Sequence, residues 1–180
     1  MSSFLNQWRP TSAHVTTPNG GILSLDLASK TGWCYGSGIG TVPLFGVWQL
    51  PAPTIAGRQA VAFENELLDA IDGFQPKLVV YEASLPAGAQ SHARTAELLI
   101  GLGVVTDMAC YRHEIEVRKE YPQTVRAKVM GPGNGRITSK QKNDGLIVRW
   151  LQARGYQVED HNAGDAILQW LYAAQVRAAA

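Results

Sequence analysis

Two short apolar runs, each carrying one acid, constrain the fold of this chain more than any other feature. Residues 22–28 read ILSLDLA and residues 77–83 read KLVVYEA. Both runs are short and rich in Leu, Val and Ile, so we predict two buried strands. An acid in such a strand is costly unless it is paired or coordinates a cation. Asp26, in the middle of the first strand, and Glu82, at the end of the second, are therefore candidate members of a polar site.

The rest of the pattern predicts an α/β fold. Two further strands, over 33–38 and 43–50, follow the first after short turns, which gives an antiparallel meander. The later elements expected along the chain are a helix over 58–73 ending at Gly73, the strand over 77–83, a helix over 90–112, a strand over 114–119, a glycine loop over 129–138, a helix over 139–154 capped by Ser139, and a helix over 162–180. This order predicts a mixed five-stranded sheet with helices on both faces.

Length and composition fit a single domain. The chain has 180 residues, of which 46% are hydrophobic and 17% are charged, so a buried core is expected. Residues 1–20 are polar and contain two prolines, which predicts a flexible arm ahead of one domain over 21–180. The N-terminus lacks a secretory apolar region and no run is long enough to span a bilayer, so a cytoplasmic protein is expected. Cys34 and Cys110 are expected to be free, buried thiols.

A third acid has the same unusual surroundings as the first two. Asp165 opens an otherwise apolar helix, before Ala166, Ile167 and Leu168. If the two acid-bearing strands are neighbours and this helix crosses them, the three carboxylates meet, and hard oxygen ligands suit Mg²⁺ or Mn²⁺. Each acid also has a simpler interpretation. Asp26 can begin a turn, Glu82 can face solvent, and Asp165 can favour the positive end of the helix.

Basic residues are concentrated in one segment. Residues 118–142 carry a net charge of +6, which leaves −5 for the rest of the chain. A basic segment on an acidic body is typical of proteins that bind a phosphate backbone. A solvated loop is the alternative interpretation. Trp33, Trp48, Trp150 and Trp170 lie in apolar runs, so we predict core packing for them rather than base stacking.

Four segments, taken in order, resemble the motifs of the RuvC-type Holliday junction resolvases. They read LSLDLASKTGW, LVVYEAS, VRAKVMGPGNGRITSKQKNDGLIVRWLQARG and DHNAGDAILQWLYA, and they extend from residue 22 to about residue 175. The resemblance implies the RNase H-like fold, which retroviral integrases also have. It further implies a metal-dependent endodeoxyribonuclease that resolves four-way DNA junctions by phosphodiester hydrolysis.

The resemblance also implies which residues form the site. Asp26, Glu82, Asn162 and Asp165 take the catalytic and metal-binding positions, with two Mg²⁺ or Mn²⁺ ions expected between them. Position 162 is more often Asp or His in the family, and Asn is more typical of phage or prophage members. Asp160 and His161 are alternative ligands, because positions 161, 162 and 165 can share one helix face.

DNA contacts and a partner subunit follow from the same resemblance. The residues expected to contact the phosphate backbone are Arg94, Arg126, Lys128, Lys140 and Lys142. Symmetric cleavage of a branched four-way junction needs two active sites, so a homodimer is implied. The glycine-interrupted helix over 90–112 is a candidate dimer surface.

The sequence argues against one other function and leaves two more open. The loop Gly131–Arg136 lacks the Walker pattern, so no nucleotide cofactor is expected. An RNase H-fold nuclease acting on flaps, forks or RNA–DNA hybrids remains open, because ASLPAGAQSHA, the segment from Ala83 onward, lacks the aromatic residue that the family often has there. A non-catalytic DNA-binding module also remains open, and Asn162 is its main support.

Overall fold

A computed structural model describes residues 20–52, 56–83, 93–136 and 145–179 of the chain. The strands are β1 (Ile22–Asp26), β2 (Lys30–Gly36), β3 (Leu44–Gln49), β4 (Leu78–Glu82) and β5 (Glu116–Glu120). The helices are α1 (Ala56–Phe74), α2 (Ala93–Arg112), α3 (Pro122–Met130), α5 (Leu146–Gln152) and α6 (His161–Ala178), with a short 3₁₀ helix η2 (Pro132–Asn134). None of these helices is long and apolar enough to cross a membrane.

The five strands form one mixed sheet in the order β3-β2-β1-β4-β5. β1 pairs antiparallel with β2, and β2 with β3, which is the predicted meander. β4 pairs parallel with both β1 and β5. The prediction of a mixed five-stranded sheet that begins with a meander is confirmed.

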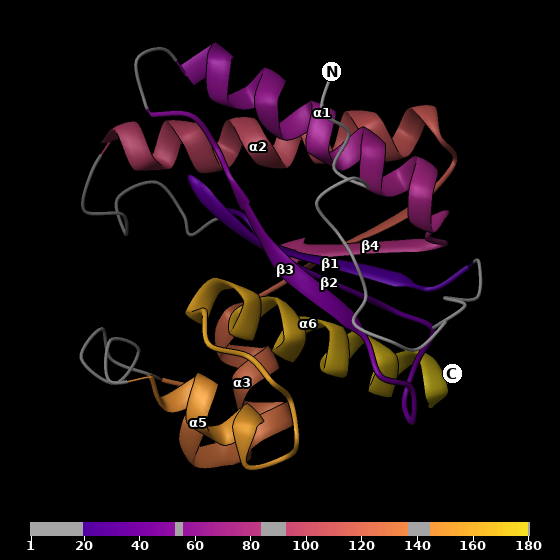
Figure 1. Ribbon diagram of the computed structural model, residues 1–180, viewed down its shortest axis with the longest axis vertical. Helices are drawn as coiled ribbons and strands as arrows, with labels where there is room; N and C mark the ends of the chain where they lie inside the picture. The colour runs from indigo at the N-terminus through magenta and orange to yellow at the C-terminus, as the bar shows by residue number, and fades with distance from the viewer. Residues whose placement is uncertain (1–19, 53–55, 84–92, 137–144, 180) are drawn as a thin grey trace.

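Helices cover both faces of the sheet, as predicted (Figure 1). α1 and α2 lie over one face, and α6 lies over the other with α3 and α5 beyond it. Side chains of β1 alternate between the two resulting cores: Leu23 and Leu25 pack with α1 and α2, whereas Ile22 packs with α6. The same alternation puts Tyr81 of β4 in the first core and Val80 in the second. Central parallel strands buried on both faces read as continuous apolar runs, which explains why both were visible in the sequence.

Most of the tryptophans pack in the core, as predicted. Trp33 and Trp48 stack with ring centres 6.3 Å apart, and Trp170 is 1% exposed. Trp150 differs, because it is only partly buried and the Arg154 guanidinium lies 3.5 Å from its ring centre. Cys34 and Cys110 are both free and buried, in agreement with the sequence.

The first acid lies at a strand end and not in a strand interior. β1 ends at Asp26, two residues before the predicted end, and β2 begins at Lys30 instead of residue 33. The turn between them is closed by Thr31, whose hydroxyl donates to the carbonyl of Ala28 at 2.7 Å. This local bond lets β2 start early, so the acid is placed where the strand gives way to a turn.

One helix was missed, and another begins later than predicted. α3 was not predicted: only Val125 is fully buried on it and no side chain caps its start, so Pro122 at its first position was the one available signal. α5 begins at Leu146, after Gly145 in a left-handed conformation with φ of 69°, and not at residue 139. Ser139 lies outside the described residues. α2 begins at Ala93, three residues after the predicted start at residue 90, and the other described element ends agree with the predictions to within two residues.

The domain prediction stays a prediction. Of the arm expected over 1–20, only Gly20 is among the described residues. Both buried clusters lie against the same sheet, which is consistent with one domain over 21–180.

Candidate active site

Asp26 and Glu82 end two neighbouring parallel strands. The pairing of β1 with β4 runs up to Leu25 opposite Tyr81, so the two acids are the next residues on each strand. Ser24 bonds to the carbonyl of Ala166 in α6, and side chains two residues apart share a face, so Asp26 and Glu82 are directed to the α6 face. Asp26 is 6% exposed, which is very low for a carboxylate.

The start of α6 is held against β1 and β2. A Cβ atom on Gly32 would overlap the carbonyl group of Asn162, so the helix backbone lies directly on β2 at this glycine. Gly32 is the pairing partner of Asp26 in the sheet. One turn further on, the Ser24 hydroxyl donates to the Ala166 carbonyl at 2.7 Å. These two contacts bring Asn162 close to the strand residue that pairs with Asp26.

Asp165 and Glu82 line one small pocket. Its volume is about 10 Å³, and its lining residues are Glu82, Pro122, Val125, Arg126, Asp165, Leu168 and Gln169. Arg126 of α3 donates from Nη2 to Asp165 Oδ1 at 3.1 Å, and the two side chains are only 13% and 5% exposed. The structure therefore brings the second and third predicted acids together with a buried guanidinium between the sheet and α3.

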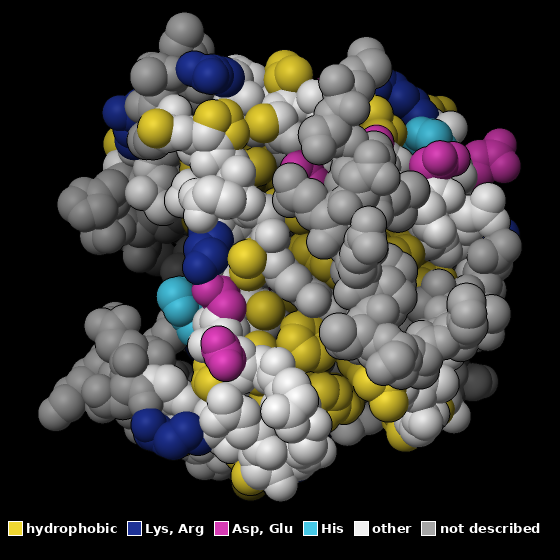
Figure 2. Space-filling view, in the orientation of Figure 1, with side chains coloured by type: hydrophobic (Ala, Val, Ile, Leu, Met, Phe, Trp, Pro, Cys, Tyr) yellow, Lys and Arg dark blue, Asp and Glu magenta, His cyan; other side chains and the backbone are white. Residues whose placement is uncertain are grey.

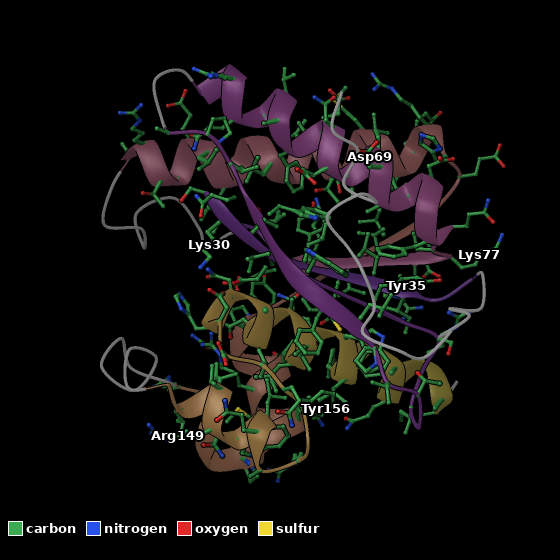
Figure 3. All side chains as sticks on the ribbon, in the orientation of Figure 1. Lys30, Tyr35, Asp69, Lys77, Arg149 and Tyr156 are labelled. Atoms are coloured by element: carbon green, nitrogen blue, oxygen red, sulfur yellow. The ribbon has the colours of Figure 1, made fainter. Side chains whose placement is uncertain are left out.

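Asp160 caps the N-terminal end of α6. Its carboxylate accepts from the backbone N–H groups of Asn162 and Ala163 and forms an ion pair with Lys30 of β2. Partial burial opposes ionisation of Asp160, but the bonds from Lys30 and the two N–H groups outweigh it and hold the pKa below its ordinary value. Lys30 lies beside the N-terminal end of α6 in Figure 3, where charged side chains gather on the surface seen in Figure 2.

The two alternative ligands differ in their surroundings from Asn162. Asn162 is 8% exposed, whereas His161 is exposed. Asp160 is already engaged by Lys30 and by the helix start. Asn162 thus has the most buried position of the three.

The predicted DNA contacts are placed at several locations. Arg94, in the first turn of α2, and Lys128, in the last turn of α3, are exposed. Arg126 is largely buried against Asp165. Lys140 and Lys142 lie outside the described residues.

The donor set fits a hard divalent cation in its chemistry. Asp26, Glu82, Asn162 and Asp165 lie on the α6 side of the sheet, and their carboxylate and amide oxygens suit Mg²⁺ or Mn²⁺. Among the described residues, no three His, Cys, Asp or Glu side chains form a ready cation site. The guanidinium of Arg126 contacts Asp165 in this arrangement.

Three contributors to the site were missed in the sequence. Gly32 and Lys30 belong to β2, and no local pattern in the sequence reveals that this strand contacts α6. Gln169 lies one helical turn after Asp165, and this spacing was the signal that it would share the pocket. The pairing of Arg126 with Asp165 depends on α3, which was itself not predicted.

The geometry matches a known class of fold. No family model matches the chain, and no curated protein matches it. Among solved structures, Thermus thermophilus RuvC is 16% identical with a TM-score of 0.66, covering 88% of this chain and 96% of that one. The same protein in complex with a Holliday junction substrate is 13% identical with a TM-score of 0.66, covering 89% and 96%. The yeast mitochondrial Holliday junction resolvase Ydc2 is 13% identical with a TM-score of 0.60, covering 89% and 80%.

These matches define the class of protein by its fold. The chain is an α/β protein with the RNase H-like fold, as predicted. Within that class its fold resembles that of the RuvC-type resolvases over most of its length, which confirms the resemblance seen in the sequence motifs. At 13–16% identity the likeness is one of fold.

Proposed function

We propose that this protein is a metal-dependent endonuclease that cuts four-way DNA junctions by phosphodiester hydrolysis. The observation that carries the proposal is the meeting of three chain segments at one end of the sheet. Glu82 and Asp165 line the same pocket, and the helix that bears Asp165 lies on the pairing partner of Asp26. Structures with this fold include a RuvC bound to a Holliday junction and a yeast mitochondrial junction resolvase.

In this proposal the acids hold the metal and the basic residues hold the DNA. Asp26, Glu82, Asn162 and Asp165 supply oxygen ligands for Mg²⁺ or Mn²⁺, two ions being expected. When bound, such ions activate a water and stabilise the leaving 3′-oxygen. The burial of Asp26 and Asp165 keeps bulk water away from the carboxylates and strengthens their attraction for a cation.

We propose that five basic residues contact the phosphate backbone of the DNA. Arg126 forms an ion pair with Asp165, and Lys128 is exposed two residues further along α3. Arg94, Lys140 and Lys142 complete the proposed set of contacts. Because phosphate contacts release counterions, binding is expected to weaken steeply with added salt.

A homodimer is part of the proposal, with α2 as its surface. Ile100, Val104, Met108 and Tyr111 are exposed by 54%, 51%, 44% and 87% and recur at intervals of three or four residues. This spacing makes one apolar stripe along α2. A second copy is the proposed occupant, because two copies related by a two-fold axis present one active site to each half of a symmetric junction. The free, buried thiols of Cys34 and Cys110 are consistent with a protein that functions in the cytoplasm.

The test compares four labelled substrates: a four-way junction, a replication fork, an RNA–DNA hybrid and a linear duplex. We expect the full chain with Mg²⁺ or Mn²⁺ to cut the junction fastest. D26N and D165N are expected to abolish cutting while junction binding persists. D69N is the matched control, since Asp69 is exposed on α1 at the opposite face of the sheet (Figure 3). Equal rates on all four substrates would contradict the junction preference.

Two other functions are separated by the same assay. Preference for forks or RNA–DNA hybrids would indicate a related nuclease, for which the absence of an aromatic residue in the sequence just after Glu82 is the support. Binding without cutting, unchanged in D26N, would indicate a non-catalytic DNA-binding module. The contact of Arg126 with Asp165 and the Asn at position 162 support that alternative.

A further inference from the structure

Gln169 is a buried polar side chain that the proposed mechanism does not use. It lies in α6 one turn after Asp165, is 3% exposed, and lines the same pocket as Glu82 and Asp165. Its Oε1 atom is buried and has no hydrogen-bond partner in the part of the chain that the structure describes. Leaving a buried amide oxygen without a hydrogen bond destabilises the fold, so native structures normally provide a partner.

Arg126 has an unused donor in the same pocket. Its Nη2 atom donates to Asp165 Oδ1 at 3.1 Å, but its Nε–H is buried and makes no hydrogen bond within the described residues. The two residues that carry this buried donor and this buried acceptor, Arg126 and Gln169, both line a single pocket of about 10 Å³. That volume is about what one water molecule needs, and a polar pocket with two or more partners is one that holds a water.

We propose that one buried water accepts from Arg126 Nε–H and donates to Gln169 Oε1. Its second O–H is available to the Glu82 carboxylate, which lines the same pocket. Through this water Gln169 is a positioning residue that holds the Arg126 guanidinium against Asp165. A divalent cation that approaches Asp165 must then compete with the guanidinium, so Gln169 sets the strength of metal binding. The effect on metal rests on the proposed function, whereas the water does not.

The direction of the effect separates this role from simple packing. If Gln169 only filled space, replacing it would disturb the pocket and weaken metal binding. If it holds Arg126 in place, its loss leaves Nε–H without a partner, the guanidinium moves off Asp165, and a divalent cation binds more tightly. Residues that orient the groups around a metal typically change its affinity by about 10–100-fold.

The experiment uses the full chain, with Q169L as the test variant and Q175L as the control. Gln175 is exposed on the same helix. Crystal structures that resolve ordered water are expected to show one molecule within hydrogen-bond distance of Arg126 Nε and Gln169 Oε1, absent in Q169L. An empty pocket in the unaltered protein, or a direct bond between the two side chains, would overturn the proposal.

Calorimetric titration with Mn²⁺, without DNA, measures the positioning effect. We expect Q169L to bind Mn²⁺ about tenfold more tightly, Q175L to behave as the unaltered protein, and Q169L to add nothing once R126M is present. Unchanged or weaker binding in Q169L, or an equal effect in the R126M background, would contradict the role.

Failure of this inference and failure of the proposed function give different results. If the protein holds the water but neither binds Mn²⁺ nor cuts DNA, the water bridge between Arg126 and Gln169 is confirmed and the nuclease assignment is wrong. If the protein cuts junctions but lacks the water, and if Q169L and Q175L bind Mn²⁺ equally, the nuclease assignment stands and the inference about Gln169 is wrong.

Discussion

Gly32 of β2 lies against the backbone carbonyl of Asn162, where α6 begins. No side chain fits between them: a Cβ atom at position 32 would overlap that carbonyl and lie 2.8 Å from the nitrogen of Ala163. The same glycine pairs with Asp26 across the sheet. The distance between the helix that bears Asp165 and the strand that bears Asp26 therefore depends on a position that has no side chain.

Replacing this glycine is expected to push α6 away from the sheet. G32A should lower the free energy of unfolding by about 1–3 kcal/mol, as overpacking usually does, and should also reduce junction cleavage. Denaturant unfolding and the cleavage rate measure the two effects. G57A is the control, because Gly57 in α1 has open space around it and should tolerate the methyl group. A G32A protein as stable and as active as the original would show that the close contact is unimportant.

Removing Arg126 is expected to make the protein dependent on metal for its stability. R126M takes the guanidinium from a buried carboxylate, and breaking a buried ion pair on one side costs about 3–5 kcal/mol. Mn²⁺ should restore much of this loss, because a bound cation takes over the neutralising charge. Thermal unfolding with and without Mn²⁺ tests this.

K128M is the matched control for that experiment, since Lys128 is exposed on the same helix. We expect K128M to keep the original stability and the original response to Mn²⁺. If Mn²⁺ raises the melting temperature of R126M no more than that of K128M, Asp165 is not part of a cation site.

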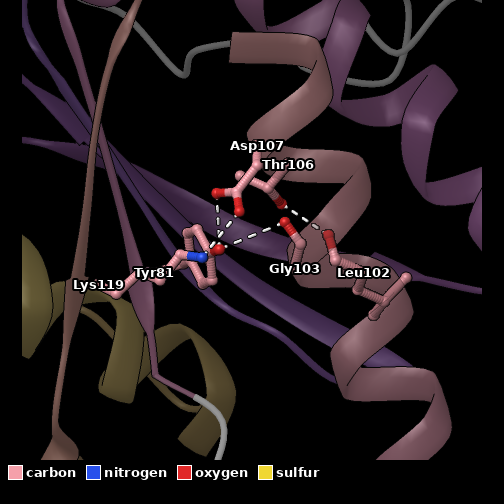
Figure 4. Close-up of polar contacts among 6 residues, drawn as sticks. All are labelled: Tyr81, Leu102, Gly103, Thr106, Asp107 and Lys119. Atoms are coloured by element: carbon pink, nitrogen blue, oxygen red, sulfur yellow. Dashed lines mark hydrogen bonds and ion pairs between the residues drawn. The ribbon is translucent and has the colours of Figure 1, made fainter. Parts of the chain in front are cut away.

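Tyr81 should make stability depend on pH in the alkaline range. Its hydroxyl donates to Asp107 at 2.7 Å, beside Lys119, on the α2 side of the sheet (Figure 4). Burial first, and then the bond to the Asp107 carboxylate, raise the pKa of Tyr81 from 10.0 to about 12. A raised pKa favours the protonated folded state, so this stabilisation is complete below pH 10 and is lost as the pH rises toward 12.

The pH dependence is isolated by comparison with Y81F. Between pH 10 and 12 the unaltered protein should lose more stability than Y81F, as measured by denaturant unfolding. Y121F is the control, because Tyr121 is 58% exposed, and it should follow the unaltered protein. If the free energy of unfolding falls equally for the original chain and for Y81F between pH 10 and 12, Tyr81 ionises at its ordinary pKa.

A charge on the apolar stripe of α2 should prevent dimer formation. V104E places a carboxylate in the middle of the stripe formed by Ile100, Val104, Met108 and Tyr111, and burying it without a partner is unfavourable. Light scattering after gel filtration should report a dimer for the original chain and a monomer for V104E. V42E is the control, because Val42 is 79% exposed in the loop between β2 and β3, away from α2. We expect the V42E protein to remain a dimer. A V104E dimer would place the interface elsewhere.

Local sequence patterns predicted the elements that bury apolar side chains regularly. Leu23 and Leu25 in β1 and Val79 and Val80 in β4 are all completely buried, so a continuous apolar run was enough to mark both strands. α3 was missed for the opposite reason. It buries only Val125 completely, lacks a capping side chain, and contacts α6 over one face, so neither periodicity nor capping signals distinguish it from a loop.

The sequence also identified the unusual acids, but not their partners. Asp26, Glu82 and Asp165 were recognisable because a charge beside apolar neighbours is costly wherever it is buried. The ion pair of Arg126 with Asp165 spans 39 residues, and that of Lys30 with Asp160 spans 130. Nothing local marks a pairing over such separations, because it depends on how α3 and α6 pack.

By itself the sequence determined the order of most strands and helices, the buried runs, and the acids that disturb them, since these follow from hydrophobic burial along short stretches of chain. Only the tertiary structure decided that β4 lies beside β1, that α6 contacts Gly32, and that Arg126 and Gln169 share a pocket with Asp165. Those relationships arise from packing between distant segments, where shape and the need to pair buried polar groups select one arrangement among many that the same local patterns allow.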